Sequence, residues 1–198
     1  MDIKAAKQTF LDIKKILDQA GIKFWLSDGT ALGAVREARI ISYDRDIDLR
    51  ALPTEWDFPI LFKKFENEGF RCVKSINPKL YKDKPSGSVI FKRGIKTDIG
   101  LNYYYPPEDL TVILAGRPLA LITVVPAKFF RGDHFVEFLG VKARIPNPPE
   151  EYFEMHYGKD WKIPKNERYW KANIPISIAK YVKYFHEHPE VNQKKEKS

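Results

Sequence analysis

Apolar residues in the first quarter of the chain recur at two different spacings. From Ile3 to Ala20 they return every three or four positions and Gly21 follows, which predicts an amphipathic helix. From Asp46 to Leu52 polar and apolar residues alternate, which predicts a strand with one buried face. Continued along the chain, these patterns predict helices at 2–20, 31–38, 55–68, 149–158 and 176–188, strands at 22–26, 46–52, 70–76, 88–93 and 95–104, a hairpin at 110–123 and an end to the strand-rich part at 141–149.

The order of these elements predicts an α+β domain. Helices and strands alternate at first, most remaining strands follow, and helices close the chain, which favours a mixed β-sheet with flanking helices. The 198 residues suit one domain, and no repeat or linker divides them. We therefore expect a single domain over residues 1–175, followed by a C-terminal helix and basic tail over 176–198.

The composition adds an excess of positive charge. The net charge is +8 and the sequence pI about 9.4, which favours anionic partners such as phosphate-bearing small molecules, an anionic membrane surface or nucleic acid. No RNA-recognition signature, zinc finger or basic helix accompanies the charge, so no nucleic-acid partner is expected.

The cysteine count and the start of the chain bear on its compartment. Cys72 is the single cysteine, which excludes an intramolecular disulfide and a cysteine-rich zinc site. The first residues lack the apolar core of a signal peptide, and no apolar run has the length of a membrane-spanning helix. We expect a cytoplasmic protein, with peripheral contact to a membrane left open.

Three aspartates stand at every second position in the stretch ISYDRDIDLRAL, residues 41–52. Within the predicted strand, Asp46 and Asp48 share one face, and Ile47 and Leu49 share the other. Two ionised carboxylates this close repel each other. A divalent cation such as Mg²⁺ reverses that penalty, because it prefers hard oxygen ligands.

A further aspartate, Asp98, lies in the strand-like run IKTDIGL. If that strand pairs beside the first, Asp98 completes a cluster of three carboxylates. A solvated strand face and the Asp-x-Asp metal site of a glycosyltransferase are the alternatives. A calcium-binding EF-hand loop is excluded, because Leu49 stands where its sharp turn requires glycine.

The stretch SDGTALGA, residues 27–34, offers a second kind of site. It follows a predicted strand and opens a helix, so its backbone amides can hold phosphate oxygens. It matches neither the dinucleotide-binding fingerprint nor the Walker loop. Phosphate binding is therefore predicted from this stretch only in combination with the aspartates.

Together these motifs resemble the LicD/fukutin family. Its signature runs Gly–Thr/Ser–Leu-Leu-Gly–x–x–Arg and then Trp-Asp-x-Asp-x-Asp-Leu; TDIGL resembles its downstream strand, and YGKDWKIP (157–164) resembles its Tyr-Gly-x-x-Trp-x-x-Pro ending. Three positions depart from the pattern: Tyr43 replaces the usual tryptophan, Ser42 stands where proline is common, and Asp28 stands where many members have glycine. The positions that match the signature are Gly29, Thr30, Leu32, Gly33, Arg36, Asp44, Asp46, Asp48 and Leu49.

The resemblance implies a nucleotidyltransferase-like fold and a transferase activity. Relatives move a phosphorylated alcohol, such as phosphocholine or ribitol phosphate, from a CDP-linked donor to a sugar hydroxyl of a glycan, and CMP leaves. We expect Mg²⁺ as the cofactor, with Mn²⁺ as an alternative. Transfer of an NMP to a small molecule or protein is an alternative reaction, and a non-catalytic antitoxin-like or nucleic-acid-binding protein is an alternative class.

Each matched residue receives an expected role. Asp46 and Asp48 hold the metal on the donor pyrophosphate, and Asp98 binds the metal nearest the acceptor hydroxyl and helps to remove its proton. Tyr157 and Trp161 are expected to pack the last helix against the sheet, and stacking on a base or an acceptor sugar is the alternative. The expected substrate-binding groups are the amides of Gly29 and Thr30, the Thr30 hydroxyl, the guanidinium of Arg36, and Asp44 behind the metal ligands.

Overall fold

The computed structural model describes residues 1–76, 85–115, 121–164 and 178–192. Its helices are α1 (Ile3–Gln19), α2 (Asp28–Glu37), α3 (Phe58–Asn67), α4 (Pro149–Tyr157) and α5 (Ile178–Glu187), with short 3-10 turns η1 (Pro53–Glu55), η2 (Pro106–Glu108), η3 (Ala127–Phe130) and η4 (Pro189–Asn192). Its strands are β1 (Phe24–Leu26), β2 (Asp46–Ala51), β3 (Arg71–Ile76), β4 (Pro85–Lys92), β5 (Ile95–Tyr105), β6 (Leu110–Ala115), β7 (Leu121–Pro126), β8 (His134–Phe138) and β9 (Val141–Ile145).

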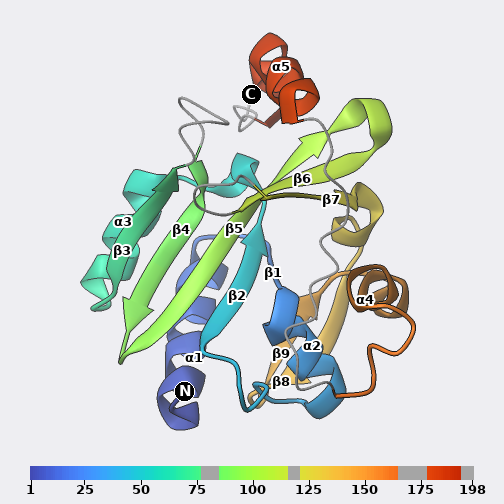
Figure 1. Cartoon of the computed structure of the whole chain (residues 1–198). Coiled ribbons are helices and arrows are strands. Elements are labelled where there is room, and N and C mark those ends of the chain that lie inside the picture. The colour runs from blue at the N-terminus through green and yellow to red at the C-terminus, as the bar shows by residue number, and fades with distance from the viewer. Residues whose placement is uncertain (77–84, 116–120, 165–177, 193–198) are drawn as a thin grey trace.

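A mixed sheet forms the centre of the molecule (Figure 1). Its strands follow the order β1-β2-β5-β4-β3, in which β2 and β5 run parallel and the other neighbours antiparallel. The long strand β5 pairs with β4 along its first part and with β6 along its last four residues, and β6 then pairs with β7. The predicted α+β class with a mixed sheet and flanking helices is confirmed.

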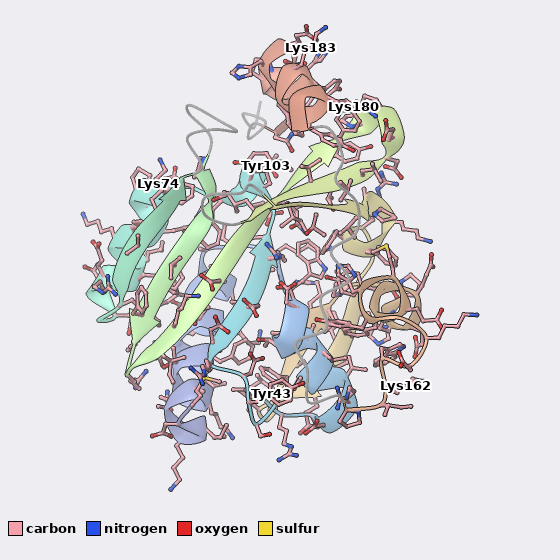
Figure 2. All side chains as sticks on the ribbon, viewed as in Figure 1. Tyr43, Lys74, Tyr103, Lys162, Lys180 and Lys183 are labelled. Atoms are coloured by element: carbon pink, nitrogen blue, oxygen red, sulfur yellow. The ribbon has the colours of Figure 1, made fainter. Side chains whose placement is uncertain are left out.

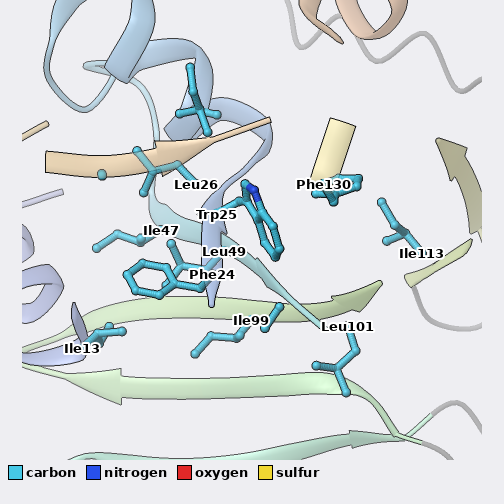
Figure 3. Packing of buried hydrophobic residues seen from close by; sticks show 14 of the residues in the cluster. Ile13, Phe24, Trp25, Leu26, Ile47, Leu49, Ile99, Leu101, Ile113 and Phe130 are labelled. Atoms are coloured by element: carbon cyan, nitrogen blue, oxygen red, sulfur yellow. The ribbon is translucent and has the colours of Figure 1, made fainter. Parts of the chain in front are cut away.

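The buried face of the sheet explains why β2 and β5 read as core strands. Ile47 and Leu49 of β2 are 0% and 1% exposed, and they pack with Ile99 and Leu101 of β5 (Figure 3). Helix α1 passes behind this sheet and adds Ile13 to the cluster (Figure 1). Burial of each such side chain contributes about 1.5–3 kcal/mol, so this face holds β2 and β5 together.

Two helices begin at other positions than the sequence predicts. Helix α2 starts at Asp28, so the residues predicted as a turn form its first turn. Helix α3 starts at Phe58 instead of residue 55, and its N-cap is Asp57, whose side chain accepts a hydrogen bond from the amide of Ile60 at 3.1 Å. The start of α3 is set by Pro59, because proline fits only the first turn of a helix.

The hairpin of β8 and β9 is an element that the sequence patterns did not fully predict. A strand-rich end at 141–149 was expected, and β9 lies there, but its partner β8 was not predicted. Strand β8 has only five residues, and one of its sides is exposed, so its apolar residues form too short a pattern to predict a strand. The hairpin contacts β1, so it extends the molecule beyond the β1 edge of the sheet.

Some predictions fall wholly or partly outside the described residues. These are the turn of the hairpin at 110–123, the boundary between 175 and 176, the first part of the final helix and the basic tail. No helix among the described residues is both long and apolar enough to cross a membrane.

Three of the labelled lysines lie well apart in the view of Figure 2. Lys74, Lys162 and Lys183 lie at the left, lower right and top of the view in Figure 2. Lys183 is 76% exposed and pairs only with Glu187 among the described residues, at 3.9 Å.

Candidate active site

The parallel pairing of β2 and β5 brings the predicted aspartates together. In this register Asp48 lies opposite Asp98, and Asp46 lies opposite Lys96. Because Ile47 and Leu49 face the core, the carboxylates of β2 face the other side of the sheet. The carboxylates of Asp46 and Asp98 are about one-third exposed, so a ligand can reach them from solvent.

Asp46, Asp48 and Asp98 each offer one carboxylate oxygen, and these oxygens lie within 4.8 Å of one another. Three hard oxygen donors this close suit Mg²⁺ or Mn²⁺, which keep several waters and take one or two carboxylates from the protein. The three residues could therefore hold a metal ion. The chemistry of the donor set fits the cofactor that the sequence predicts.

Lys96 places a positive charge against this cluster. Its Nζ donates a hydrogen bond to Oδ2 of Asp46 at 3.1 Å and another to Oδ2 of Asp98. Partial burial lowers the pKa of Lys96, but the hydrogen bonds to Asp98 and Asp46 outweigh it, so the pKa is raised overall. The ammonium group thus acts as a cation that the carboxylates attract, which is the chemistry expected of a metal site.

Asp48 is the member of the cluster whose acidity the fold changes clearly. Burial raises the pKa of its carboxyl to about 8, and the negative charges of Asp28, Asp46 and Asp98 act in the same direction. A divalent cation would remove this penalty, because it stabilises the ionised form.

Asp28 and Arg50 form a buried ion pair beside the cluster that the sequence patterns missed. Nη2 of Arg50 lies 2.9 Å from Oδ2 of Asp28, and both side chains are under 15% exposed. A Cβ at Gly100 would overlap the guanidinium of Arg50, so this close approach requires glycine there. The spacing in the sequence could have indicated Arg50, since it stands two positions after Asp48 and so lies on the same face of β2 as Asp46 and Asp48.

The departure from the family pattern at Asp28 has a structural explanation. Asp28 opens α2 with a φ of 48°, a left-handed conformation that glycine adopts freely and aspartate tolerates better than most residues. Its carboxylate accepts hydrogen bonds from the hydroxyl of Ser27 and from Arg50, each at 2.9 Å. Aspartate at this position therefore supplies the counter-ion of Arg50.

The start of α2 is hydrogen-bonded to β2, the strand that carries Asp46 and Asp48. The amide of Asp48 donates a hydrogen bond to Oγ1 of Thr30 at 2.9 Å, and its carbonyl accepts one from the amide of Ser27 at 3.0 Å. Thr30 is 0% exposed. Its hydroxyl thus positions Asp48, and a direct phosphate contact from this hydroxyl stays a prediction.

Asp44 lies against the start of α2 and outside the three-carboxylate cluster. A Cβ at Gly29 would come within 2.5 Å of Oδ2 of Asp44, so glycine allows the two segments to meet. The predicted roles of Gly29 and Asp44 in binding substrate phosphates stay predictions.

Arg36, Tyr157 and Trp161 are the remaining predicted residues near α2 and α4. Tyr157 ends α4 and stacks on Phe153 with ring centroids 6.2 Å apart. The side chain of Arg36 is 7% exposed, and Nη2 lies 3.5 Å from Oε1 of Glu37, a long contact. Its predicted phosphate contact stays a prediction. Trp161 is 5% exposed and stacks on Phe153 of α4 with ring centroids 4.8 Å apart, which is the packing role expected of it.

The mixed sheet, its flanking helices and the carboxylates on two neighbouring parallel strands define a nucleotidyltransferase-like α+β domain. The family model described as LicD/FKTN/FKRP, nucleotidyltransferase domain, matches residues 21–148. The chain belongs to this family, which confirms the resemblance noted in its motifs.

Individual relatives agree with the family model. The human ribitol-5-phosphate transferase FKTN is 30% identical over 175 residues, which cover 87% of this chain and 36% of that protein. The mouse ribitol 5-phosphate transferase FKRP is 38% identical over 47 residues, or 24% of this chain and 10% of that protein. This chain thus spans about a third of the length of FKTN.

One solved structure aligns along most of the chain. It is that of ANT(2")-Ia in complex with adenylyl-2"-tobramycin, with a TM-score of 0.47 and 14% identity over 91% of this chain and 86% of that one.

Proposed function

We propose that this domain transfers a phosphorylated alcohol from a CDP-linked donor to a sugar hydroxyl of a glycan, with release of CMP. The observation that carries the proposal is the cluster of Asp46, Asp48 and Asp98 on the open face of β2 and β5. The names of the relatives FKTN and FKRP, both ribitol-phosphate transferases, support the choice of reaction.

In this proposal the three carboxylates divide the work. Asp46 and Asp48, with Asp98 as the third ligand, would hold Mg²⁺, or Mn²⁺ in its place, beside the donor pyrophosphate. When bound, the ion neutralises charge on the transferred phosphoryl group and on the leaving CMP. Asp98 accepts the proton of the acceptor hydroxyl, whose oxygen bonds to phosphorus as the bond between phosphorus and the CMP oxygen breaks.

The groups around the cluster bind the donor. Lys96 gives up its contacts with Asp46 and Asp98 and turns to the donor phosphates, since its ammonium and the metal compete for the same oxygens. The backbone amides of Gly29 and Thr30, at the start of α2, bind the negatively charged phosphates of the donor, because the helix dipole makes the N-terminus of a helix favourable for anions. Arg36 and Asp44 complete the substrate-binding set, with Arg36 as a contact to phosphate.

The test is binding and turnover with defined donors. The purified chain is mixed with Mg²⁺ and CDP-ribitol, CDP-choline, CDP-glycerol, CTP, ATP or UDP-sugars, and thermal shift identifies which of them bind. CMP release is then measured in the presence of sugar acceptors. We expect a CDP-alcohol to bind in a metal-dependent way and to yield CMP.

Asparagine substitutions separate the site from the rest of the surface. Asp46→Asn, Asp48→Asn and Asp98→Asn are each expected to lower CMP release about 100-fold or more while the chain stays folded. The control is Asp18→Asn, which changes only an exposed pair with Lys14 and should leave turnover unaffected. Wild-type turnover in a site variant would remove that residue from the site, and pyrophosphate release from ATP would point to NMP transfer.

A further inference from the structure

A cavity of about 290 Å³ lies apart from the carboxylate cluster, where the second part of β5 meets η1, β6, η3 and η4. None of the three cluster aspartates lines it. The side chains that matter for its chemistry are Thr54, Asn102, Tyr104, Phe130, Arg131 and Asn192.

Asn102 is the unusual residue of this cavity. Its side chain is 0% exposed, and neither its amide nitrogen nor its amide oxygen has a hydrogen-bond partner among the described residues. A buried amide without partners costs free energy, and most such groups in folded proteins are satisfied. Asn102 therefore brings to the wall of the cavity one donor group and one acceptor that nothing in the described protein uses, and a small side-chain rotation would turn them toward a ligand.

A second asparagine in the same cavity provides the contrast. The amide of Asn192 accepts a hydrogen bond from the backbone amide of Tyr104 at 2.8 Å and donates one to its carbonyl at 3.0 Å. Asn192 thus pairs with β5 much as a neighbouring strand would, and its role is to hold η4 in place. The Asn102 amide makes no comparable hydrogen bonds to the described backbone.

The charge at the rim is already neutralised. Arg131 is the charged residue among those that line the cavity, and its Nη1 donates a hydrogen bond to Oδ2 of Asp109 at 3.0 Å. The hydroxyl of Tyr104 also donates to this aspartate, at 3.1 Å. A phosphate or carboxylate ligand would have to break this pair, so a neutral ligand fits better.

Apolar side chains, one of them aromatic, line the rest of the cavity. Leu52, Ala127 and Phe130 line the cavity, and Phe130 is fixed edge-on against Trp25 with ring centroids 5.4 Å apart (Figure 3). An aromatic wall favours a planar ring, and an asparagine amide pairs in a bidentate way with a ring edge that carries an adjacent donor and acceptor. A volume of this size holds a small ring system.

We propose that this cavity binds a nucleobase, held by Asn102 through its amide and by Phe130 through its ring. The base has two sources: a free nucleoside, or the base of the nucleotide donor. The second source rests on the proposed function. Asn102 follows Asp98 by four residues on the same face of β5, about 13 Å along the strand, with buried Arg50 over Gly100 between them.

The test begins with nucleosides and needs neither metal nor turnover. Cytidine, uridine, adenosine and guanosine are titrated into the wild-type chain without Mg²⁺, and the side-chain NH₂ resonances of Asn102 are followed by ¹⁵N NMR. We expect saturable shifts of this resonance with at least one nucleoside. No shift with any nucleoside or CDP-alcohol would overturn the proposal, whether or not the chain proves to be a transferase.

Two variants sharpen the test, and for both of them nucleoside binding is followed by the backbone amide resonances of Tyr104 and Arg131, which also line the cavity. Asn102→Leu fills the same space without the amide and is expected to weaken nucleoside binding about tenfold or more while raising thermal stability. Asp18→Asn is the control, since Asp18 forms an exposed pair with Lys14 and does not line the cavity, and it should bind the nucleoside as the wild type does. Equal nucleoside binding by Asn102→Leu and the wild type would overturn the proposal.

The two sources of the base are separated by donor kinetics. If the base of the donor enters the cavity, Asn102→Leu raises KM for the CDP-alcohol with little change in kcat. If a free nucleoside is the ligand, Asn102→Leu leaves both constants as they are, and the nucleoside still binds the wild type. Either result supports a nucleobase site.

Discussion

Asp48 is partly buried and lies near three other carboxylates, and both features raise the pKa of its carboxyl. The ordinary pKa of an aspartate is near 3.8, whereas burial, with the charges of Asp28, Asp46 and Asp98, raises the pKa of Asp48 to about 8. The fold thus holds this proton more tightly than the unfolded chain does. The stability that the protonated group contributes is complete below the unfolded pKa and is lost as the pH rises through the folded pKa.

Replacing Asp48 by asparagine should remove this pH dependence. Asp48→Asn keeps a neutral side chain at every pH, so the metal-free variant is expected to exceed the wild type by roughly 1–3 kcal/mol at about pH 9 and to match it closely near pH 4. Urea unfolding in EDTA at both pH values measures the difference. Asp18→Asn serves as the exposed control, and an equal gain at both pH values would contradict the assignment.

At the scale of elements, the start of α2 and the strand β2 act as one unit. Thr30 and Ser27 hold the amide and the carbonyl of Asp48, and Asp28 holds Arg50 two residues further along β2. The position of the Asp48 carboxylate therefore depends on the helix as much as on the sheet. The motif predicts that Thr30 contacts phosphate, but its hydroxyl already accepts a hydrogen bond from the amide of Asp48.

Thr30 offers a test of this coupling. Thr30→Val keeps the shape but leaves the amide of Asp48 without its acceptor, which is expected to cost about 1–3 kcal/mol of stability and to lower turnover. Thr30→Ser retains the hydroxyl and should keep both nearer to the wild type. Thermal unfolding and CMP release measure the two effects, and a valine variant with wild-type values would show that the hydrogen bond contributes nothing.

At the scale of the whole molecule, α5 completes the domain. Tyr181 and Phe185 are each 1% exposed and pack on the aromatic residues at the end of β5; the ring of Tyr105 lies 4.8 Å from that of Tyr181 and 6.2 Å from that of Phe185. The turn η4 that follows is fixed to Tyr104 through Asn192. The described part of the C-terminal region therefore belongs to the core.

Phe185→Ala tests this role of α5. Loss of a buried phenylalanine is expected to destabilise the whole domain by about 3–5 kcal/mol in a single unfolding transition. Lys183→Ala, on the same helix and largely exposed, should change the free energy of unfolding by about 0.5 kcal/mol or less. Denaturant unfolding followed by circular dichroism measures both, and a small effect of Phe185→Ala would mean that α5 packs loosely.

The sequence by itself determined the local features of this protein. The alternation in β2 assigned Asp46 and Asp48 to one face and Ile47 and Leu49 to the other, because the geometry of a strand has a period of two. The spacing of apolar residues likewise predicted α1 within a residue or two of its observed bounds. The motifs led to Asp98 and to the family before any fold was known.

Only the tertiary structure decided which of these features meet. The parallel register puts Asp48 opposite Asp98, and the ion pair of Asp28 with Arg50 joins α2 to β2. The tertiary structure also leaves the buried amide of Asn102 without a partner among the described residues. A periodic pattern describes one segment at a time, and it carries no record of its neighbours in space. The pairing of distant strands and the burial of polar groups are settled by the packing of the whole core.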